Sequence, residues 1–446
     1  MTDRRKNRIP ELDGLRVLMI AVVSWFHIWQ QSWLFPDPRL PALIRKFLGG
    51  TLGINTSLAW LPGTGYIWVD GTVLLSVFLL YLPWAEAKRK GTPMPATGDF
   101  YFRRARRILP AYYFILLCHL LVIALPWNQY GGNLPWMVRD IATHLTFTFT
   151  RYEDTYITTP LGGAAWTVAI LVQGYLLFPL MARGVRKHPV AVLGGMLAAC
   201  FAYRAYVLWS AADQFSRFGI PPNYSMKVNQ LINFLDVYVI GVLCAIAFDA
   251  VRGSREKRRR QSRSRRRNRY LRQTGMTLVF FTALYALIRL LQVQFRANEY
   301  ELQAWQMTYR PLFALCFGAM VVSAPSALWP LRILLGNPVT RFLAGISMNF
   351  YLIHQTVAVH LKYRLRLPWT ETFLSEDFLV DGLYPNQVWD ETWMVRYAWL
   401  CFAVAFVMAV AVTYLVEKPC AKLFDMARKK LAERRAAGQR DGSFVQ

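Results

Sequence analysis

The chain has 446 residues, of which 55% are hydrophobic and 15% aromatic, and its formal net charge is +26 at pH 7. This apolar share exceeds that of typical soluble domains, so the composition excludes an ordinary soluble globular protein. The positive charge does not by itself indicate a nucleic-acid partner, because no recognition motif surrounds its densest run, Arg252 to Arg272.

The first hydrophobic segment follows a basic lead-in and carries Arg16 near its start and His27 well inside. Eleven residues are close to three helical turns, so both side chains face the same way, with a rise of about 16 Å between them. Ionisable groups are costly in lipid and usually face the bundle interior at a functional site. The alternative is that His27 only hydrogen-bonds a neighbouring helix.

Asp70 lies near the outer end of the second apolar segment, at a depth that should match that of His27. A carboxylate at this depth is expected to orient the imidazole and to stabilise its charged form. The alternative is that Asp70 lies at the water interface without a partner.

Four arginines precede the third apolar segment within five residues, more than the topology of the chain requires. Guanidinium groups bind phosphate bidentately, so this cluster is a candidate clamp for a phosphorylated donor such as coenzyme A. The alternative is ordinary positive charge at a membrane surface, with snorkelling side chains. The four residues are Arg103, Arg104, Arg106 and Arg107.

The later segments contain further polar and aromatic residues. Trp166 opens the fourth segment as a candidate interfacial or packing aromatic. The ninth segment is more polar than a passive anchor, since it contains Ser347, Asn349, His354 and Gln355. His354 and His360 are six residues apart, about 120° on a helix, so they do not predict a paired metal site.

Ten apolar runs reach the length of a membrane span, which predicts an all-α polytopic bundle. We expect a membrane domain over residues 1–420 and a basic, partly disordered tail over 421–446. Segment 127–163 is expected to be a long outer loop whose middle, from Arg139 to Thr150, forms a short interfacial helix or a re-entrant segment. The predicted spans are 16–34, 66–85, 108–126, 164–181, 189–209, 230–249, 274–293, 308–323, 342–361 and 396–416.

Charge in the connecting loops predicts the orientation. Loops 86–107, 182–188, 250–273 and 324–341 and both tails are basic, whereas loop 362–395 contains six acids. The positive-inside rule therefore places both termini in the cytoplasm of a multi-pass cell-membrane protein. The run from Arg252 to Arg272 contains 12 Lys or Arg residues and one Glu, which indicates contact with anionic membrane lipid.

The cysteines and the N-terminus exclude other classes of protein. The apolar run at the N-terminus is long and no small-residue cleavage site follows it, which argues against a cleavable signal peptide. The cysteines show no paired spacing and lie in or beside apolar runs, so neither a disulfide framework nor a zinc site is expected. They are Cys118, Cys200, Cys244, Cys316, Cys401 and Cys420.

Five stretches occur in the order of one family. The chain resembles the acyltransferase-3 family of integral-membrane O-acyltransferases over nearly its full length. The similar stretches are LDGLRVLMIAVVSWFH (Leu12 to His27), VDGTVLLSVF (Val69 to Phe78), RRARRILPAYY (Arg103 to Tyr113), SMNFYLIHQ (Ser347 to Gln355) and VEKP (Val416 to Pro419).

The chain also departs from the family pattern. Where family members often carry a glutamate in the fourth segment, this chain carries Leu171. Gly71 and Thr72 stand where aromatics are usual, and Val77 stands where glycine is usual. Some relatives have a fused extracytoplasmic domain, whose absence here calls for direct transfer or a separate partner protein.

The resemblance implies transfer of an acyl group, often acetyl, from cytoplasmic acyl-CoA to a hydroxyl of a cell-surface glycan or a related membrane acceptor. His27 would be the general base, with direct transfer and an acyl-histidine intermediate both open. Asp70 would orient His27, and Arg16 would bind the donor phosphate or the thioester region. The expected substrate-binding residues are Arg103, Arg104, Arg106, Arg107, Trp166, His354 and Gln355.

Two other classes remain as alternatives. A transporter should show inverted repeats or broken helices in corresponding halves, and neither is evident in the sequence. A catalytically silent relative that binds lipid or glycan is favoured by Leu171 but opposed by the intact Arg16, His27 and arginine cluster. No metal is expected in any of these readings.

Overall fold

The computed structural model describes residues 8–32, 42, 46, 57–218, 225–259, 266–296, 299–364 and 391–442. This part of the chain is helical and contains no β-strand element. Ten of its helices are long and apolar enough to cross a membrane, which confirms the predicted all-α bundle of ten spans. Five of the six acids in loop 362–395 lie outside the described residues, and so do residues 260–265 of the basic run.

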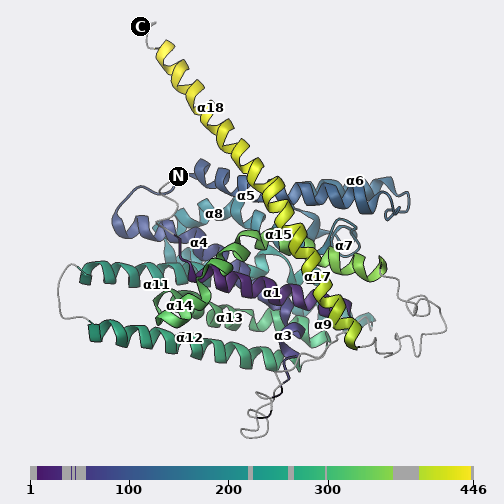
Figure 1. The fold of residues 1–446 in the computed structure, drawn as a ribbon, viewed down its shortest axis with the longest axis horizontal. Coiled ribbons are helices and arrows are strands. Elements are labelled where there is room, and N and C mark those ends of the chain that lie inside the picture. Colours follow the sequence, from purple (N-terminus) through teal and green to yellow (C-terminus); the bar gives the residue numbers. More distant parts are fainter. Residues whose placement is uncertain are drawn as a thin grey trace.

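The long helices pack around α1 and α4 (Figure 1). Both are largely apolar and most of their residues are buried, as expected for central helices of a bundle. The principal helices are α1 (Glu11–Gln31), α4 (Trp68–Lys90), α5 (Thr97–Cys118), α8 (Trp166–Lys187), α9 (Pro189–Phe218), α11 (Leu235–Arg259), α12 (Arg266–Phe295), α13 (Glu299–Ser323), α15 (Pro338–Arg364), α17 (Glu391–Val412) and α18 (Lys418–Gly442).

Helix α1 packs along α15 on one side and against α4 on another. At its start it meets the short helix α14 (Trp329–Leu335). A side chain on Gly14 would lie 2.4 Å from the carbonyl oxygen of Leu335, so only glycine allows this close approach. The approach sets the depth of Arg16, two residues further along α1.

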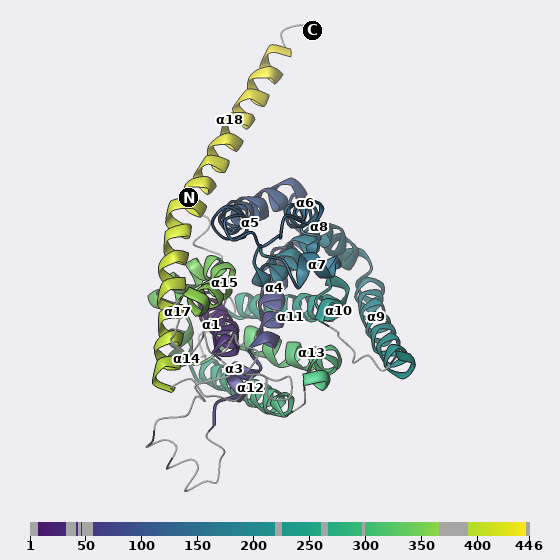
Figure 2. The ribbon, with the colours of Figure 1, turned by 90° about the vertical axis from the view of Figure 1, so that its right-hand side faces the viewer.

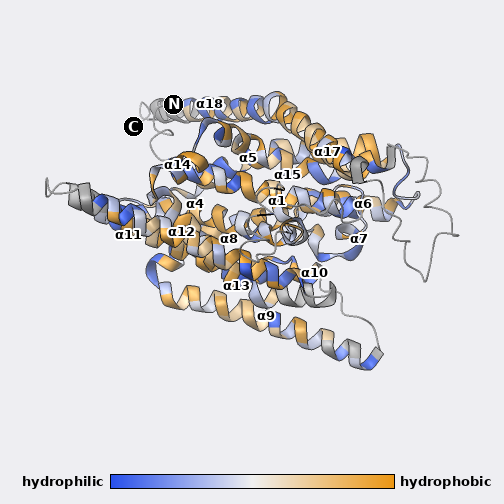
Figure 3. Cartoon of the chain, turned by 60° about the horizontal axis from the view of Figure 1, so that its bottom comes forward, coloured by the Kyte–Doolittle hydropathy of each residue, from blue (hydrophilic) through white to orange (hydrophobic). Residues whose placement is uncertain are grey.

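Helices α9 and α17 lie at opposite edges of the bundle (Figure 2). Colouring by hydropathy shows that both carry apolar residues along their length (Figure 3). Large side chains on these helices remain exposed, including Phe201 and Trp209 on α9 and Trp399 and Val407 on α17. Apolar faces of this kind suit contact with lipid chains.

Ion pairs join several helices at the end of the bundle where α1 begins. Arg89 at the end of α4 donates to Asp249 on α11 with an Nε–Oδ2 distance of 2.8 Å. Glu11 at the start of α1 accepts from Arg332 of α14 at 2.7 Å. Basic residues of the predicted loops therefore also hold helix ends together.

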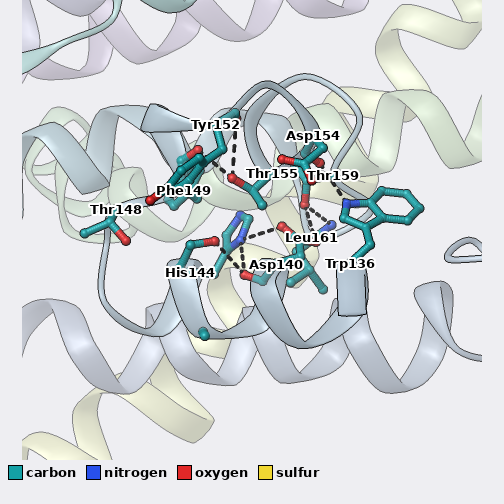
Figure 4. Close-up of polar contacts among 12 residues, drawn as sticks. Trp136, Asp140, His144, Thr148, Phe149, Tyr152, Asp154, Thr155, Thr159 and Leu161 are labelled. Atoms are coloured by element: carbon teal, nitrogen blue, oxygen red, sulfur yellow. Dashed lines mark hydrogen bonds and ion pairs between the residues drawn. The ribbon is translucent and has the colours of Figure 1, made fainter. Parts of the chain in front are cut away.

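The connection between α5 and α8 contains a helix, α6 (Leu134–Leu145), followed by the short α7 (Glu153–Tyr156). Asp140 on α6 is fully buried and accepts from Thr159 Oγ1 at 2.8 Å (Figure 4). Its neighbour on the same face, His144, stacks on Phe149 with ring centroids 3.9 Å apart. The region predicted as a loop with one short helix is therefore an ordered, internally bonded unit.

The described part of the C-terminal region is helical up to Gly442. Helix α17 passes through a π-helical turn, η9 (Thr413–Glu417), into α18, which continues to Gly442 and projects from the bundle (Figures 1 and 2). Asp425 of α18 pairs with Arg106 of α5 at 2.6 Å. The π-helical turn lies where the VEKP stretch begins, and residues 443–446 lie outside the described part.

Candidate functional site

A cavity of about 190 Å³ lies between α1, α4, α5, α8 and α15. Its walls combine arginines with apolar and hydroxyl side chains, so it suits a ligand with both charged and apolar parts. We call it the arginine cavity. It is lined by Arg16, Met19, Ile20, Thr72, Leu75, Ser76, Leu79, Arg104, Arg107, Ile108, Thr167, Val168, Leu171, Tyr175, Ser347, Met348 and Tyr351.

Three arginines from two helices that are far apart in sequence meet in this cavity. Arg16 reaches it from α1, and Arg104 and Arg107 reach it from α5. Arg104 and Arg107 are three residues apart, so they share a face of α5 that is turned toward α1. The guanidinium of Arg104 lies 5.9 Å from the centre of the Tyr175 ring on α8, which limits its rotation.

The charge of these arginines is not neutralised by ion pairs. None of the three forms an ion pair with a carboxylate among the described residues, and Nε of Arg104 is buried without a hydrogen-bond partner there. Three cationic groups around a small, partly apolar space create a positive potential that an anionic ligand would relieve. The cavity is therefore a candidate site for a phosphate-bearing ligand.

The other two arginines of the cluster lie elsewhere. Arg106 pairs with Asp425 and donates to the carbonyl oxygen of Ala421 at 2.9 Å, so it anchors α18. Arg103 is exposed and does not line the cavity. Of the four arginines predicted to bind substrate, Arg104 and Arg107 line the cavity, whereas Arg103 and Arg106 do not.

His27 and His354 form a direct side-chain pair between α1 and α15. The Nδ1 atom of His27 lies 2.9 Å from Nε2 of His354, and the ring centroids are 5.0 Å apart. The sequence singled out both histidines but gave His27 a different partner. The pair forms because α1 and α15 pack along each other.

The hydrogen bonds define the tautomers of the pair. Nδ1 of His354 lies 2.6 Å from the carbonyl oxygen of Tyr351, and a carbonyl can only accept, so Nδ1 of His354 carries a proton. In the neutral ring Nε2 of His354 is then the acceptor, and His27 donates from Nδ1. Nε2 of neutral His27 consequently carries the lone pair.

Tyr351 connects the histidine pair to the arginine cavity. It lines the cavity, and its carbonyl oxygen holds His354 one helical turn further along α15. Its hydroxyl lies 2.6 Å from the hydroxyl of Thr167 on α8, which also lines the cavity. Sequence reasoning missed Tyr351, although it lies within the stretch from Ser347 to Gln355, and it missed Thr167, which directly follows Trp166.

Asp70 does not orient His27, which corrects the expected role of this carboxylate. Its Oδ2 accepts from Nε of Arg310 at 2.9 Å, and both side chains are fully buried. Arg310 lies on α13. The sequence did not show that α13 packs against the face of α4 that carries Asp70. A buried carboxylate is charged, and burying an unpaired charge costs free energy, whereas a neutral imidazole carries no such cost. Asp70 is therefore paired with a cation.

The Asp70–Arg310 pair belongs to a larger buried network. Arg310 also donates to the carbonyl oxygen of Asn233 at 3.1 Å, and its guanidinium lies 3.9 Å from the Phe234 ring centre. Arg204 on α9 donates to Asn233 Oδ1 at 2.6 Å and to Asp236 at 2.8 Å. The network joins α4, α9, α11 and α13 inside the bundle.

Two further predicted substrate-binding residues lie outside the cavity. Trp166 begins α8 and contacts Phe234, with ring centroids 6.3 Å apart. Gln355 follows His354 on α15, and its Oε1 is buried without a hydrogen-bond partner among the described residues. Trp166 therefore has a packing contact, whereas Gln355 lies next to the histidine pair.

The two late stretches that resemble the family touch each other. Nδ2 of Asn349 donates to Glu417 at 2.8 Å and to Thr413 at 2.7 Å. Both partners belong to the π-helical turn η9, a feature often found at functional sites. This contact fixes α15, and with it His354, against the end of α17.

Fold and site together define a multi-pass membrane protein with an arginine-lined cavity near the His27–His354 pair. The chain matches the family model described as "Acyltransferase domain" over residues 9–418. It therefore belongs to the acyltransferase-3 family, which indicates a membrane acyltransferase. No curated protein and no solved structure matches the chain.

Proposed function

We propose that this protein transfers an acyl group, with acetyl as the first candidate, from acyl-CoA in the cytoplasm to a hydroxyl of a cell-surface glycan or related membrane acceptor. The observation that carries the proposal is the cluster of three arginines in the arginine cavity, which is linked through Tyr351 to the His27–His354 pair. Coenzyme A supplies the phosphates that such a cavity would bind. Membership of the acyltransferase-3 family supports the same chemistry.

The residues have distinct roles in the proposed reaction. Nε2 of His27 takes the proton of the acceptor hydroxyl as its oxygen forms an ester bond with the acyl carbon. The carbon–sulfur bond breaks, and coenzyme A leaves as a thiolate that takes up a proton. His354 holds His27 in the tautomer whose Nε2 can accept the proton, so it is a positioning residue. The same lone pair would serve an acyl-histidine route.

Removing one cavity arginine should weaken donor binding. We expect Arg104→Ala to lower the affinity for acetyl-CoA by about tenfold to one-hundredfold, because charge-assisted hydrogen bonds to phosphate are lost. Equilibrium binding to the purified protein in lipid nanodiscs measures this. Arg106→Ala is the matched control, since it removes the same charge from the same helix outside the cavity.

The control also defines what would contradict the proposal. Arg106→Ala should change the affinity by less than about threefold, because its partner Asp425 is half-exposed. Equal losses in both variants would indicate a general charge effect instead of a phosphate site. A wild-type protein that binds no acyl-CoA at all would refute the donor assignment.

A catalytically silent relative remains the second candidate, and one observation favours it. Leu171, which stands where the family often has a glutamate, lines the arginine cavity. If that glutamate takes part in the reaction elsewhere, this chain lacks it at the corresponding place. A protein that binds acyl-CoA but never releases free coenzyme A, with any acceptor offered, would favour the silent reading.

Membrane lipid is a further proposed partner. The run from Arg252 to Arg272, which lies partly in α11 and α12, is proposed to contact anionic headgroups in the cytoplasmic leaflet. Replacing its arginines by glutamine should weaken binding of the detergent-solubilised protein to phosphatidylserine liposomes several-fold at physiological salt. Unchanged binding would contradict this role.

A separate extracytoplasmic partner protein is proposed only if transfer to the acceptor is not direct.

A further inference from the structure

A second, larger cavity of about 390 Å³ lies on the other side of the α1–α15 contact, between α1, α15 and α17. We call it the apolar groove. Its walls are aliphatic and aromatic, apart from Ser347, whose hydroxyl is already bonded to the carbonyl oxygen of Ala344 at 3.0 Å. The lining of the groove is therefore suited to hydrocarbon.

The apolar groove and the arginine cavity share two residues. Ile20 on α1 and Ser347 on α15 line both spaces, so the two spaces adjoin. Along α1, Arg16 lines the cavity and its neighbour Val17 lines the groove. The two spaces thus lie side by side at the same depth in the bundle.

The apolar groove also reaches the histidine pair. Phe350 lines the groove, and its ring stacks on that of His354 with an interplanar angle of 10° and centroids 6.3 Å apart. On its other face Phe350 stacks against Phe402 of α17 at 6.2 Å, which extends the aromatic wall away from the histidines. Phe350 therefore lies both in the wall of the groove and against His354.

We infer that the apolar groove binds the hydrocarbon chain of an acyl-CoA donor whose acyl group is longer than acetyl. The inference rests on the proposed function, since it assumes that the donor's phosphates occupy the arginine cavity and that its thioester lies at the histidines. A ligand with anionic, reactive and hydrocarbon parts fits these three adjoining regions in that order. An acetyl group would leave the groove without a role in substrate binding.

Burial of methylene groups predicts how much more tightly a longer acyl-CoA should bind. Hydrocarbon moved from water into an apolar groove is favourable in proportion to the area removed from water. Octanoyl-CoA has six more methylene groups than acetyl-CoA, so the wild-type protein should bind it at least about tenfold more tightly, after the cost of ordering the chain. Both donors share the same phosphates, so the arginine cavity does not discriminate between them.

The test compares octanoyl-CoA with acetyl-CoA on the purified full-length protein in nanodiscs of defined phospholipid. Ala403→Trp on α17 and Ala21→Trp on α1 fill the groove from opposite walls. Val407→Trp is the matched control, because Val407 is 64% exposed on the same helix as Ala403 and does not line the groove. Binding affinity and release of free coenzyme A are measured for each variant, with thermal unfolding as a check on folding.

The expected result is selective loss. Each groove variant should lower octanoyl-CoA affinity to about that of acetyl-CoA, while acetyl-CoA binding and the unfolding temperature stay unchanged and Val407→Trp behaves as wild type. Equal wild-type affinity for both donors, with phospholipid retained in the groove, would overturn the inference and leave the proposed function intact. Loss of both donors in the groove variants would overturn it as well. If wild type binds neither donor, the proposed function fails, and the inference fails with it.

Discussion

His27→Ala should lower acyl-CoA consumption by a factor of about 10² to 10⁴, the usual contribution of a general base. The substitution removes the ring nitrogen whose lone pair is not used within the histidine pair. Donor affinity should remain within about threefold of wild type, because phosphate binding is proposed to depend on Arg16, Arg104 and Arg107. The measurement is release of free coenzyme A by the purified protein in lipid, where slow hydrolysis replaces transfer to an acceptor.

A second variant separates the base from the residue that positions it. His354→Gln retains a side chain that can accept from His27 Nδ1, whereas His354→Ala removes the acceptor. We expect His354→Ala to lower kcat with little effect on KM, and His354→Gln to recover a substantial part of the loss. A His27→Ala protein that consumes acyl-CoA at the wild-type rate would contradict the assignment of the base. Equal defects in both His354 variants would contradict the tautomer argument.

Arg310→Met should lower the free energy of unfolding by about 3–5 kcal/mol, the largest stability effect we expect. The change leaves Asp70 as an unpaired carboxylate inside the bundle, where both partners of the pair are fully buried. Unfolding of the purified protein, followed by helical circular dichroism in a mixed detergent and denaturant titration, measures the loss. Arg428→Met is the control, because its partner Asp99 and Arg428 itself are largely exposed, so it should cost less than about 1 kcal/mol.

The double variant Asp70→Leu with Arg310→Met tests the origin of this loss. Replacing both charges removes the unpaired carboxylate, so the double variant should be more stable than Arg310→Met alone. It should also keep acyl-CoA consumption if Asp70 acts only through packing. A double variant that is stable but does not consume acyl-CoA would indicate that Asp70 takes part in catalysis.

The stretches SMNFYLIHQ and VEKP contact each other, which gives both a structural role. Asn349 holds Glu417 and Thr413 at the π-helical turn, so the end of α17 is tied to the middle of α15. His354 lies little more than one turn beyond Asn349 on the same helix. The contact therefore supports the position of the histidine pair, although neither Asn349 nor Glu417 lines the arginine cavity.

Much of this protein follows from its sequence alone. The length and spacing of the apolar runs determine ten membrane-spanning helices, because a lipid environment requires each span to satisfy its backbone hydrogen bonds internally. Helical periodicity brings Arg104 and Arg107 to one face of α5. The ordered stretches from Leu12 to Pro419 identify the family, which the match over residues 9–418 confirms.

Partners between helices depend on the tertiary structure. Periodicity states which side chains share a face but not which helix that face meets, so the sequence paired Asp70 with His27, whereas the packing pairs Asp70 with Arg310 and His27 with His354. An arginine inside the predicted span 308–323 was the available signal for a buried acidic partner. The arginine cavity and the apolar groove arise only where α1 and α15 pack together, because a space between helices is defined by both walls and by neither helix alone.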